Sequence, residues 1–599
     1  MKKTLTLILL LFTASFFVSG QTSKKITVLH TNDLHSHFQG FAPESAYTPL
    51  TTGDDKTVGG FSRIAAIISG ERAGNPDGTV VVDAGDCMMG TIFHTMELYS
   101  GFELRLMKKA GYDVMSLGNH DFDLGPARYA RMVNVAASEG PIPELILSNA
   151  VTDPTDVSDD PFEELYDTRL LKQYTILERE GIRIGLFSLI GKDADESAPY
   201  APPVTFASNV KTAKLMVEKL KEQGCSVIIC LSHSGVTLTK EGKWDGEDVE
   251  LASKVKGIDL IVSGHTHTLL DKPVMVDGTP IVQVECAGKY VGEVELNWDG
   301  TKTSLISYKV IPVNDDIAGD PEIQSLITEQ EKKIDFQVLK PLGLTCSMPV
   351  ARASFPLTCE EYGDVASSNL GQFVADAIYG YSNCKGPGTD IAVTAAGIIR
   401  DPVLPGIQSV ADIFRVMSLG SGNDGVPGYP LSRIYVTGRE LKNIIEALLM
   451  TSASTPSNYC FYSHLKVTFD PKKRLFNKVI QLELTDNAGN KSIIDTSKKN
   501  KRLYSIVSDS YMLDNISLIK KKSFGLLNVV PKDRNGESIQ DMKTAIMDFD
   551  KTRNGTQEGK EWLALIYFLD GNRGQDSISI PVIPVYYMSP DFSTEKLTR

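Results

Sequence analysis

The stretch ITVLHTNDLH, residues 26–35, joins a short apolar run to a group of Asn, Asp and His side chains. A run of this length and composition is typical of a strand that is buried on both faces. Such strands belong to layered α/β domains, where sites form at the carboxyl ends of the strands. The polar end of this stretch is therefore a candidate site.

Four further segments repeat the arrangement, because an apolar run again ends in Asp, Asn or His. They are TVVVDAGD (79–86), DVMSLGNHD (113–121), CSVIICLSHSG (225–235) and IDLIVSGHTH (258–267). Helical stripes of apolar residues lie between the runs, at 61–74, 102–111 and 209–224. Strands that alternate with helices predict an α/β domain with its polar clusters along one edge.

The side chains at these five ends have the chemistry of metal ligands. Asp, His and Asn without Cys bind divalent ions such as zinc, manganese, cobalt or iron. Seven candidate ligands are too many for one tetrahedral ion, but they suit two ions. Two ions about 3.5–4 Å apart can hold the attacking and departing oxygens of a displacement at phosphorus. The sequence therefore predicts two divalent metal ions of unknown identity.

The segment GNHDFD, residues 118–123, completes a recognisable set. LHTNDLH, DAGDCMMGT, GNHDFD, LSHSG and SGHTHT occur in an order and spacing that resemble the 5′-nucleotidase branch of the calcineurin-like metallophosphoesterases. The resemblance covers roughly residues 25–310 well. It implies a metallophosphoesterase sandwich of two or four layers that holds two metals. A helical linker and an α+β substrate-binding domain are expected to follow.

The resemblance also implies a role for each polar residue. Ligands of one metal are expected at Asp33, His35 and His267, although the family often has another residue type where His267 stands. Ligands of the second metal are expected at Asn119, His233 and His265, with Asp86 as the bridge between the two ions.

His120 and Asp123 are expected to be catalytic. His120 resembles the imidazole that faces the substrate phosphate, and Asp123 resembles the carboxylate that orients its ring. A neighbouring carboxylate favours the charged form of an imidazole. For the other polar side chains near these motifs we expect structural or solvent-exposed positions: His30 in the core, His37 solvated on a loop, and His94 and Asp121 structural.

The first twenty residues, MKKTLTLILLLFTASFFVSG, predict a cleaved secretory signal. Two Lys precede an apolar stretch that is shorter than the ~20 residues of a membrane-spanning helix. We therefore expect an exported protein, periplasmic or extracellular, without a membrane span in the mature chain. The net charge of −14 argues against a nucleic-acid partner. The sequence does not predict the oligomeric state.

The polar segment 318–342 is expected to be the linker helix, because Pro321 can start a helix and Gly343 can end it. It divides the expected metallophosphoesterase domain (21–317) from the C-terminal domain (343–599). In the latter, 369–381 and 438–449 have helical stripes. Strand-like runs with mixed pairing are expected around them.

The C-terminal domain departs from the family in its substrate contacts. The segment TAAGIIRD (394–401) retains Arg400, a predicted substrate-binding residue, but has Ala395 and Ala396 where Asn and Gly are usual. Ala366 stands where the family often has Arg. The segment MSLGSGNDG (417–425), with Leu419, lacks the usual base-stacking aromatic ring. Replacements could come from Tyr511 or Phe524 for the ring, and from Lys520–Lys522 for the charge, but ordinary packing roles are favoured.

Three functions fit these observations. The first is an exported phosphoester hydrolase, similar to 5′-nucleotidases, that acts on nucleotides or related small phosphorylated molecules. The second is a phosphodiesterase, a nucleotide-sugar hydrolase or a hydrolase of non-nucleotide esters with an altered substrate domain. The third is a binding protein on the same fold, which the complete set of metal-ligand motifs disfavours.

Overall fold

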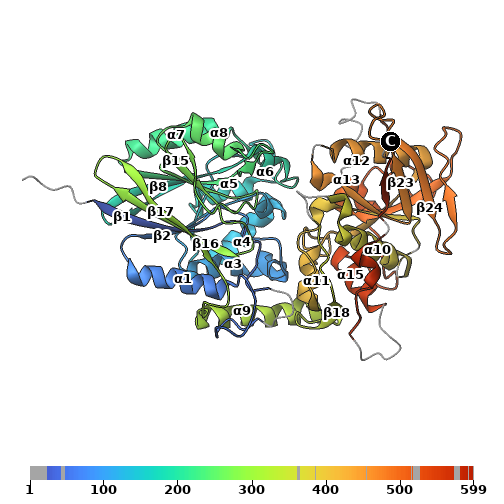
Figure 1. Ribbon diagram of the computed structural model, residues 1–599, viewed down its shortest axis with the longest axis horizontal. Coiled ribbons are helices and arrows are strands. Elements are labelled where there is room, and N and C mark those ends of the chain that lie inside the picture. The colour runs from blue at the N-terminus through green and yellow to red at the C-terminus, as the bar shows by residue number, and fades with distance from the viewer. Residues whose placement is uncertain are drawn as a thin grey trace, which may run out of the picture.

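A computed structural model describes residues 23–597 except 42–46, 360–364, 385, 387, 454, 515, 517–526, 572–579 and 591. The expected signal peptide lies outside the described residues, as do Lys520–Lys522 and Phe524. The chain forms two lobes that lie side by side, the first blue to green and the second yellow to red (Figure 1).

Two sheets form the centre of the first lobe. The first has the order β17 (Thr303–Pro312), β16 (Tyr290–Trp298), β1 (Lys24–Thr31), β2 (Thr79–Asp83), β3 (Val114–Ser116), β4 (Glu144–Ile146) and β6 (Leu171–Lys172). The second has the order β14 (Val274–Val276), β15 (Thr279–Val282), β13 (Leu260–Ser263), β10 (Val227–His233), β8 (Ile182–Ile190) and β7 (Tyr174–Arg179).

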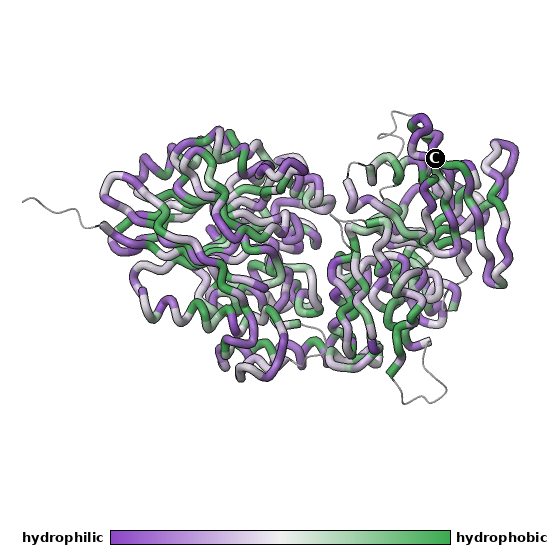
Figure 2. The backbone as a smooth tube through the Cα atoms, in the orientation of Figure 1, coloured by the Kyte–Doolittle hydropathy of each residue, from purple (hydrophilic) through white to green (hydrophobic). Residues whose placement is uncertain are grey.

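A dry core joins the two sheets. Val28 and Val82 from the first sheet pack in one buried cluster with Ile229 and Leu231 from the second. Helices cover the outer faces: α1 (Phe61–Gly74), α3 (Phe102–Ala110) and α4 (Pro126–Glu139) on the first sheet, and α7 (Asn209–Glu222) and α8 (Glu247–Lys254) on the second. The lobe is therefore a four-layer sandwich, with hydrophobic residues along its inner strands (Figure 2).

The strand arrangement brings the five polar clusters together. β1, β2 and β3 are parallel neighbours in the first sheet, and β10 and β13 are parallel neighbours in the second. Every cluster lies at or just after the carboxyl end of one of these strands, so all five meet at one edge of the sandwich. The predicted α/β architecture is confirmed.

Helix α9 (Pro321–Ile334) leads towards the second lobe along its lower side (Figure 1). The Asp320 carboxylate caps it by accepting hydrogen bonds from the amides of Glu322 and Ile323. A π-helical segment, Asp335–Leu339, and a 3-10 turn, Lys340–Leu342, continue the helix. Gly343 ends the segment with a φ of 75°. These turns lie within the segment 318–342, and the division of the chain into two domains with a linker there stays a prediction.

The second lobe combines two four-stranded sheets with helices. One sheet has the order β21 (Leu431–Thr437), β26 (Leu503–Asp509), β19 (Ile391–Ala395) and β22 (Cys460–Ser463), and the other β25 (Lys491–Ile493), β24 (Val479–Thr485), β23 (Leu465–Phe469) and β27 (Thr594–Lys596). Helices α10 (Asn369–Cys384), α11 (Val410–Val416), α12 (Gly438–Thr451) and α15 (Glu561–Asp570) accompany them, with β18 (Pro349–Ala353) and β20 (Gly406–Ser409) as a separate pair. β19 is parallel to β26 and antiparallel to β22, which confirms the mixed pairing.

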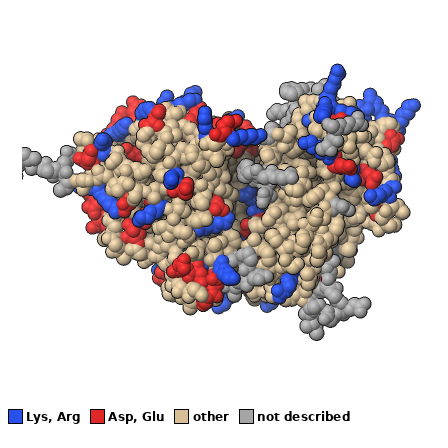
Figure 3. All heavy atoms as spheres, viewed as in Figure 1, with Lys and Arg blue, Asp and Glu red and all other residues tan. Residues whose placement is uncertain are grey.

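Charges of both signs are interspersed over the face of the molecule drawn in Figure 3. Within the described part of the chain, no helix has both the length and the apolar character needed to cross a bilayer.

The core between the sheets yields a stability prediction. Ile229→Ala should lower the free energy of unfolding by roughly 2–5 kcal/mol, because it opens a cavity in a closed core. Ile306→Ala is the matched control, since Ile229 is 0% exposed and Ile306 is 51% exposed. Denaturant unfolding measures both. Equal effects of the two substitutions would contradict the proposed sheet-on-sheet packing.

Candidate functional site

At this edge of the sandwich, two groups of three side chains bring candidate metal-binding atoms together. Asp33, His35 and His267 form one group, and Asp33, Asp86 and His233 form the other, with the atoms of each group within 4.8 Å of one another. The Nε2 atoms of His35 and His267 are 3.1 Å apart, and His233 Nε2 lies 3.1 Å from Asp86 Oδ2. Asp33 belongs to both groups, so two binding positions here would be adjacent.

The two remaining predicted ligands border these groups. The backbone amide of His265 donates hydrogen bonds to both carboxylate oxygens of Asp33, at 3.0 and 3.1 Å. Asn119 directly precedes His120, whose amide donates to Asp86 Oδ1 at 2.8 Å. The structure thus gathers all seven predicted residues in one region, while their individual roles as ligands stay predictions.

The backbone at these positions is strained. Five of the seven residues have φ values between 47° and 74°, a region that side chains other than Gly rarely adopt: Asp33, His35, Asp86, His265 and His267. Such strain persists only where the surroundings enforce it, and it collects at functional sites. Gly118 is needed for close approach, because a Cβ there would lie 2.2 Å from Asp86 Oδ1.

Three of the imidazoles are oriented through one ring nitrogen. His233 Nδ1 lies 2.9 Å from the carbonyl oxygen of Ala84, and His35 Nδ1 lies 3.2 Å from that of Met88. His265 Nε2 lies 3.1 Å from the carboxylate of Asp193, a residue that the sequence analysis missed. Metal-ligating His residues usually donate one N–H to an oxygen in this way, which leaves the other nitrogen for the ion.

The donor set fits divalent ions. The buried Asn119 Oδ1 has no hydrogen-bond partner among the described residues, and such an orphan acceptor is costly without a ligand. Carboxylate, amide and imidazole groups together match borderline-hard divalent ions. The residues present are therefore suited to the expected metals, although the geometry does not identify the element.

Charge pairing governs the protonation of the cluster. Burial would raise the pKa of Asp33, but His267 and His233 outweigh it and lower that pKa to about 2. Burial would lower the pKa of His233, but the Asp86 carboxylate raises it to about 10. A cation that binds His233 therefore has to displace a proton.

His120 and Asp123 lie as expected for an oriented imidazole. His120 Nδ1 is 2.8 Å from Asp123 Oδ2, and the ring of His120 packs against that of His35 with centroids 5.4 Å apart. Asp121 turns away from them and accepts hydrogen bonds from the amides of Gly118 and Asp86, the structural role that was expected. The segment GNHDFD thus supplies an oriented imidazole beside the predicted ligand Asp86.

The expectation for one imidazole is wrong. His37 is not solvated: its side chain is 7% exposed, and Nε2 lies 3.4 Å from Asp401 of the second lobe. The sequence missed this because the partner lies far along the chain. The expectations for two others are confirmed, since His30 is fully buried in β1 and the buried His94 packs against Phe414.

Arg400, the predicted substrate-binding residue, lies close enough to His35 for its charge to act on that imidazole. Burial is the main reason that the pKa of His35 lies well below its usual value, and the positive charge of Arg400 contributes to the same shift. Of the residues that depart from the family, Ala366 is exposed, whereas Ala395, Ala396 and Leu419 are buried.

A cavity of about 360 Å³ opens beside Asp123, between the lobes. Asp123, Arg128 and Tyr200 of the first lobe and Asn423 and Tyr429 of the second are among the residues that line it. The ring of Tyr429 stacks against Tyr511 with centroids 5.5 Å apart and planes inclined by 16°. Sequence reasoning named Tyr511 but missed Tyr429, which no local pattern distinguishes.

Two known families match the chain. Residues 26–269 match the family described as calcineurin-like phosphoesterase, and residues 350–520 match the family described as 5′-nucleotidase, C-terminal domain. The 5′-nucleotidase of Rattus norvegicus is 25% identical over 538 residues, which are 83% of this chain and 84% of that protein.

Two further comparisons differ in how much they cover. The trifunctional nucleotide phosphoesterase protein YfkN of Bacillus subtilis (strain 168) is 24% identical over 504 residues, which are 79% of this chain but only 31% of that protein. The chain therefore spans about a third of the length of that relative. A 5′-nucleotidase precursor from Thermus thermophilus superposes with a TM-score of 0.68 at 22% identity, over 96% of this chain and 100% of that chain, which shows the same fold.

The ligand cluster yields a prediction about metal content. Asp86→Ala should lose both ions, because its carboxylate is the expected bridge between them and lies against His233 and the amide of His120. Elemental analysis after saturation with manganese or zinc measures the ratio of metal to protein. Asp486→Ala, at an exposed position of the second lobe, is the control and should keep the wild-type ratio. A wild-type ratio of one, or an unchanged ratio in Asp86→Ala, would refute the two-metal site.

Proposed function

The chain belongs to the 5′-nucleotidase family of calcineurin-like metallophosphoesterases, and from this premise we propose that it hydrolyses small phosphoesters, nucleotides among them. The proposal assigns two divalent ions to the seven predicted ligands. The observation that carries it is the contact of 2.8 Å between His120 and Asp123, immediately beside the buried carboxylates of Asp33 and Asp86. This arrangement combines an oriented proton donor with a site for cations.

The chemistry follows from the positions of the residues. Divalent ions, when bound, neutralise charge on the phosphoryl oxygens and make a water more acidic. Asp123 holds the His120 ring through Nδ1, which leaves Nε2 to hold or deliver a proton at the departing oxygen. Arg400 supplies a positive charge from the second lobe to the phosphate. None of these steps requires a covalent intermediate on the protein.

The part of the substrate beyond the phosphate would occupy the cavity beside Asp123. The partly exposed Tyr200 offers an aromatic surface there, Arg128 and Asn423 offer polar contacts, and Tyr429 lines the cavity with only 5% of its surface exposed. One face of the Tyr429 ring is taken up by its stacking on Tyr511. We therefore propose a pocket that accepts a ring without strong selectivity for one nucleobase.

Export belongs to the same proposal. It is supported by the basic and apolar pattern of the first twenty residues, which is typical of a secretory signal. An enzyme outside the cytoplasm would act on phosphorylated molecules that reach the periplasm or the medium.

The catalytic role of His120 has a direct test. His120→Ala should keep its metal content but lose roughly 10²–10⁴-fold in kcat, the usual contribution of a general acid or base. Activity and elemental analysis on the same preparations separate chemistry from metal loss. His464→Ala is the control, because it also removes an imidazole, but one that stacks on Tyr379 in the second lobe and not one beside the predicted ligands. A wild-type kcat in His120→Ala would remove this residue from the mechanism.

Selectivity can be measured on a pair of substrates. With the same metal, kcat/KM for 4-nitrophenyl phosphate should equal or exceed that for AMP, because the usual base-stacking segment lacks an aromatic ring. Arg400→Ala should lower kcat/KM for both. A large preference for AMP would contradict the weak selectivity, and Tyr429→Leu would then test whether this ring supplies the base contact. A preference for bis(4-nitrophenyl) phosphate would favour the phosphodiesterase alternative.

A further inference from the structure

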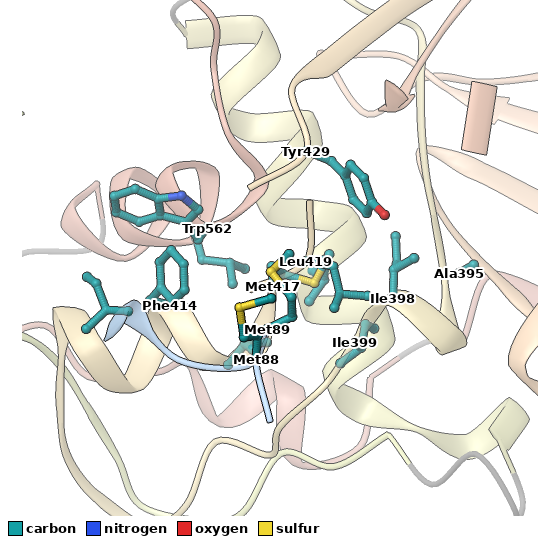
Figure 4. Close-up of a cluster of buried hydrophobic side chains, with 14 of the residues drawn as sticks. Met88, Met89, Ala395, Ile398, Ile399, Phe414, Met417, Leu419, Tyr429 and Trp562 are labelled. Carbon is teal, nitrogen blue, oxygen red and sulfur yellow. The ribbon is translucent and has the colours of Figure 1, made fainter. Parts of the chain in front are cut away.

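The second lobe packs against two of the five loops that carry predicted ligands in the first lobe, the loops after β1 and β2. Met88 and Met89 follow Asp86 on one of these loops, and both are 1% exposed. Figure 4 shows them among Phe414, Met417 and Leu419 of the second lobe, in one hydrophobic cluster that continues through both lobes. The apolar part of the interface thus packs directly behind the candidate metal centre.

A polar contact lies on the other loop. Asp401 lies 3.4 Å from His37 Nε2 and forms an ion pair with Arg415 at 2.8 Å, and the three side chains are only 7–16% exposed. The Arg415 guanidinium also lies over the ring of Phe41, 5.2 Å from its centroid, and the His37 ring packs on Phe41 at 5.6 Å. Asp401 therefore binds a side chain from each lobe at once.

The charges around Asp401 favour its ionised form. Burial would raise the pKa of this carboxyl group, but the hydrogen bond from His37 and the charges of Arg415 and Lys289 lower it to about 2. Removing one member of a buried ionic cluster leaves the others uncompensated, which is strongly unfavourable. Replacing one member of this cluster should therefore cost more than breaking an exposed ion pair would.

Arg400 and Asp401, neighbours in the second lobe, act on His35 and His37 of the first lobe. Asp401 directly follows Arg400 and contacts His37, while Arg400 exerts its charge on His35, two residues before His37. The Arg400 amide also donates to the carbonyl oxygen of Val416, the residue after Arg415. The loop that carries Arg400 is thus tied to the loop that carries a predicted metal ligand.

We propose that Asp401 is a positioning residue, which sets the Arg400 guanidinium opposite the metal-binding loop by pairing with His37 across the lobes. The proposal rests on the proposed function, since it takes Arg400 as the cation that meets the substrate phosphate. Misplacement of a catalytic or binding group by about 1 Å can cost up to 10²-fold in rate. Asp401 would act through Arg400 alone, without touching the substrate.

The test is a double-mutant cycle on the full-length, metal-loaded protein. Asp401→Asn keeps the shape of the side chain and should lower kcat/KM for a phosphomonoester about 10-fold or more, with unchanged metal content. In the Arg400→Ala background the same change should have almost no further effect, because the group that it positions is gone. An equal loss in both backgrounds, or no loss at all, would overturn the proposal.

The affinity for inorganic phosphate, measured by calorimetry, gives a readout that does not depend on turnover. The wild type should bind phosphate more tightly than Arg400→Ala, and Asp401→Asn should resemble Arg400→Ala. If the wild type hydrolyses no phosphoester, the proposed function fails, but the phosphate affinities still test the positioning. A wild type that binds no phosphate, or an Asp401→Asn variant with wild-type affinity, would overturn it.

Two controls distinguish positioning from a general loss of structure. Gln39→Ala removes another contact between segments, the hydrogen bond of 3.0 Å to Glu331 on α9, and should leave both readouts unchanged. His37→Gln retains a donor near the position of Nε2 and should keep most of the activity, whereas His37→Leu should behave like Asp401→Asn. This pair carries the test if Asp401→Asn does not fold, and equal activities of the two His37 variants would count against the proposal.

Discussion

The contact between the Asp86 carboxylate and the His233 imidazole ties the two sheets of the first lobe together at their carboxyl edges. Asp86 follows β2 of one sheet, and His233 ends β10 of the other, with 3.1 Å between Oδ2 and Nε2. Both side chains are buried, so neither charge is tolerable without the other or a cation. The packing of the two sheets against each other and the geometry of the site therefore depend on the same contact.

Much of the first lobe could be predicted because its strands are parallel and buried on both faces. Such strands read as apolar runs that stop abruptly, and the residues that follow each run must lie on the same edge of the sheet. The sites of Asp33 after β1 and of Asn119 after β3 followed from this rule alone. Local helical stripes likewise predicted α1 at its observed bounds, Phe61–Gly74.

The residues that sequence reasoning missed all depend on partners far along the chain. His37 was expected to be solvated because its own segment offers no partner, whereas Asp401 is 364 residues away. Tyr429 lines the cavity and stacks on Tyr511, a residue of a distant segment of the chain. Asp193 reaches His265 from a short helix with no distinguishing motif. Patterns within a window cannot predict contacts of this kind.

The interface between the lobes connects the loops of the candidate metal centre with the lobe that carries Arg400. The loop after Asp33 carries His37 to Asp401, and the loop after Asp86 carries Met88 and Met89 into the core shared with the second lobe. Packed cores do not deform continuously, so a change in the second lobe reaches the ligand loops through these contacts. Ala395 and Leu419 lie in the same shared core. A substitution at either residue therefore changes the packing behind Met88 and Met89, on the loop after Asp86, as well as the packing of the second lobe itself.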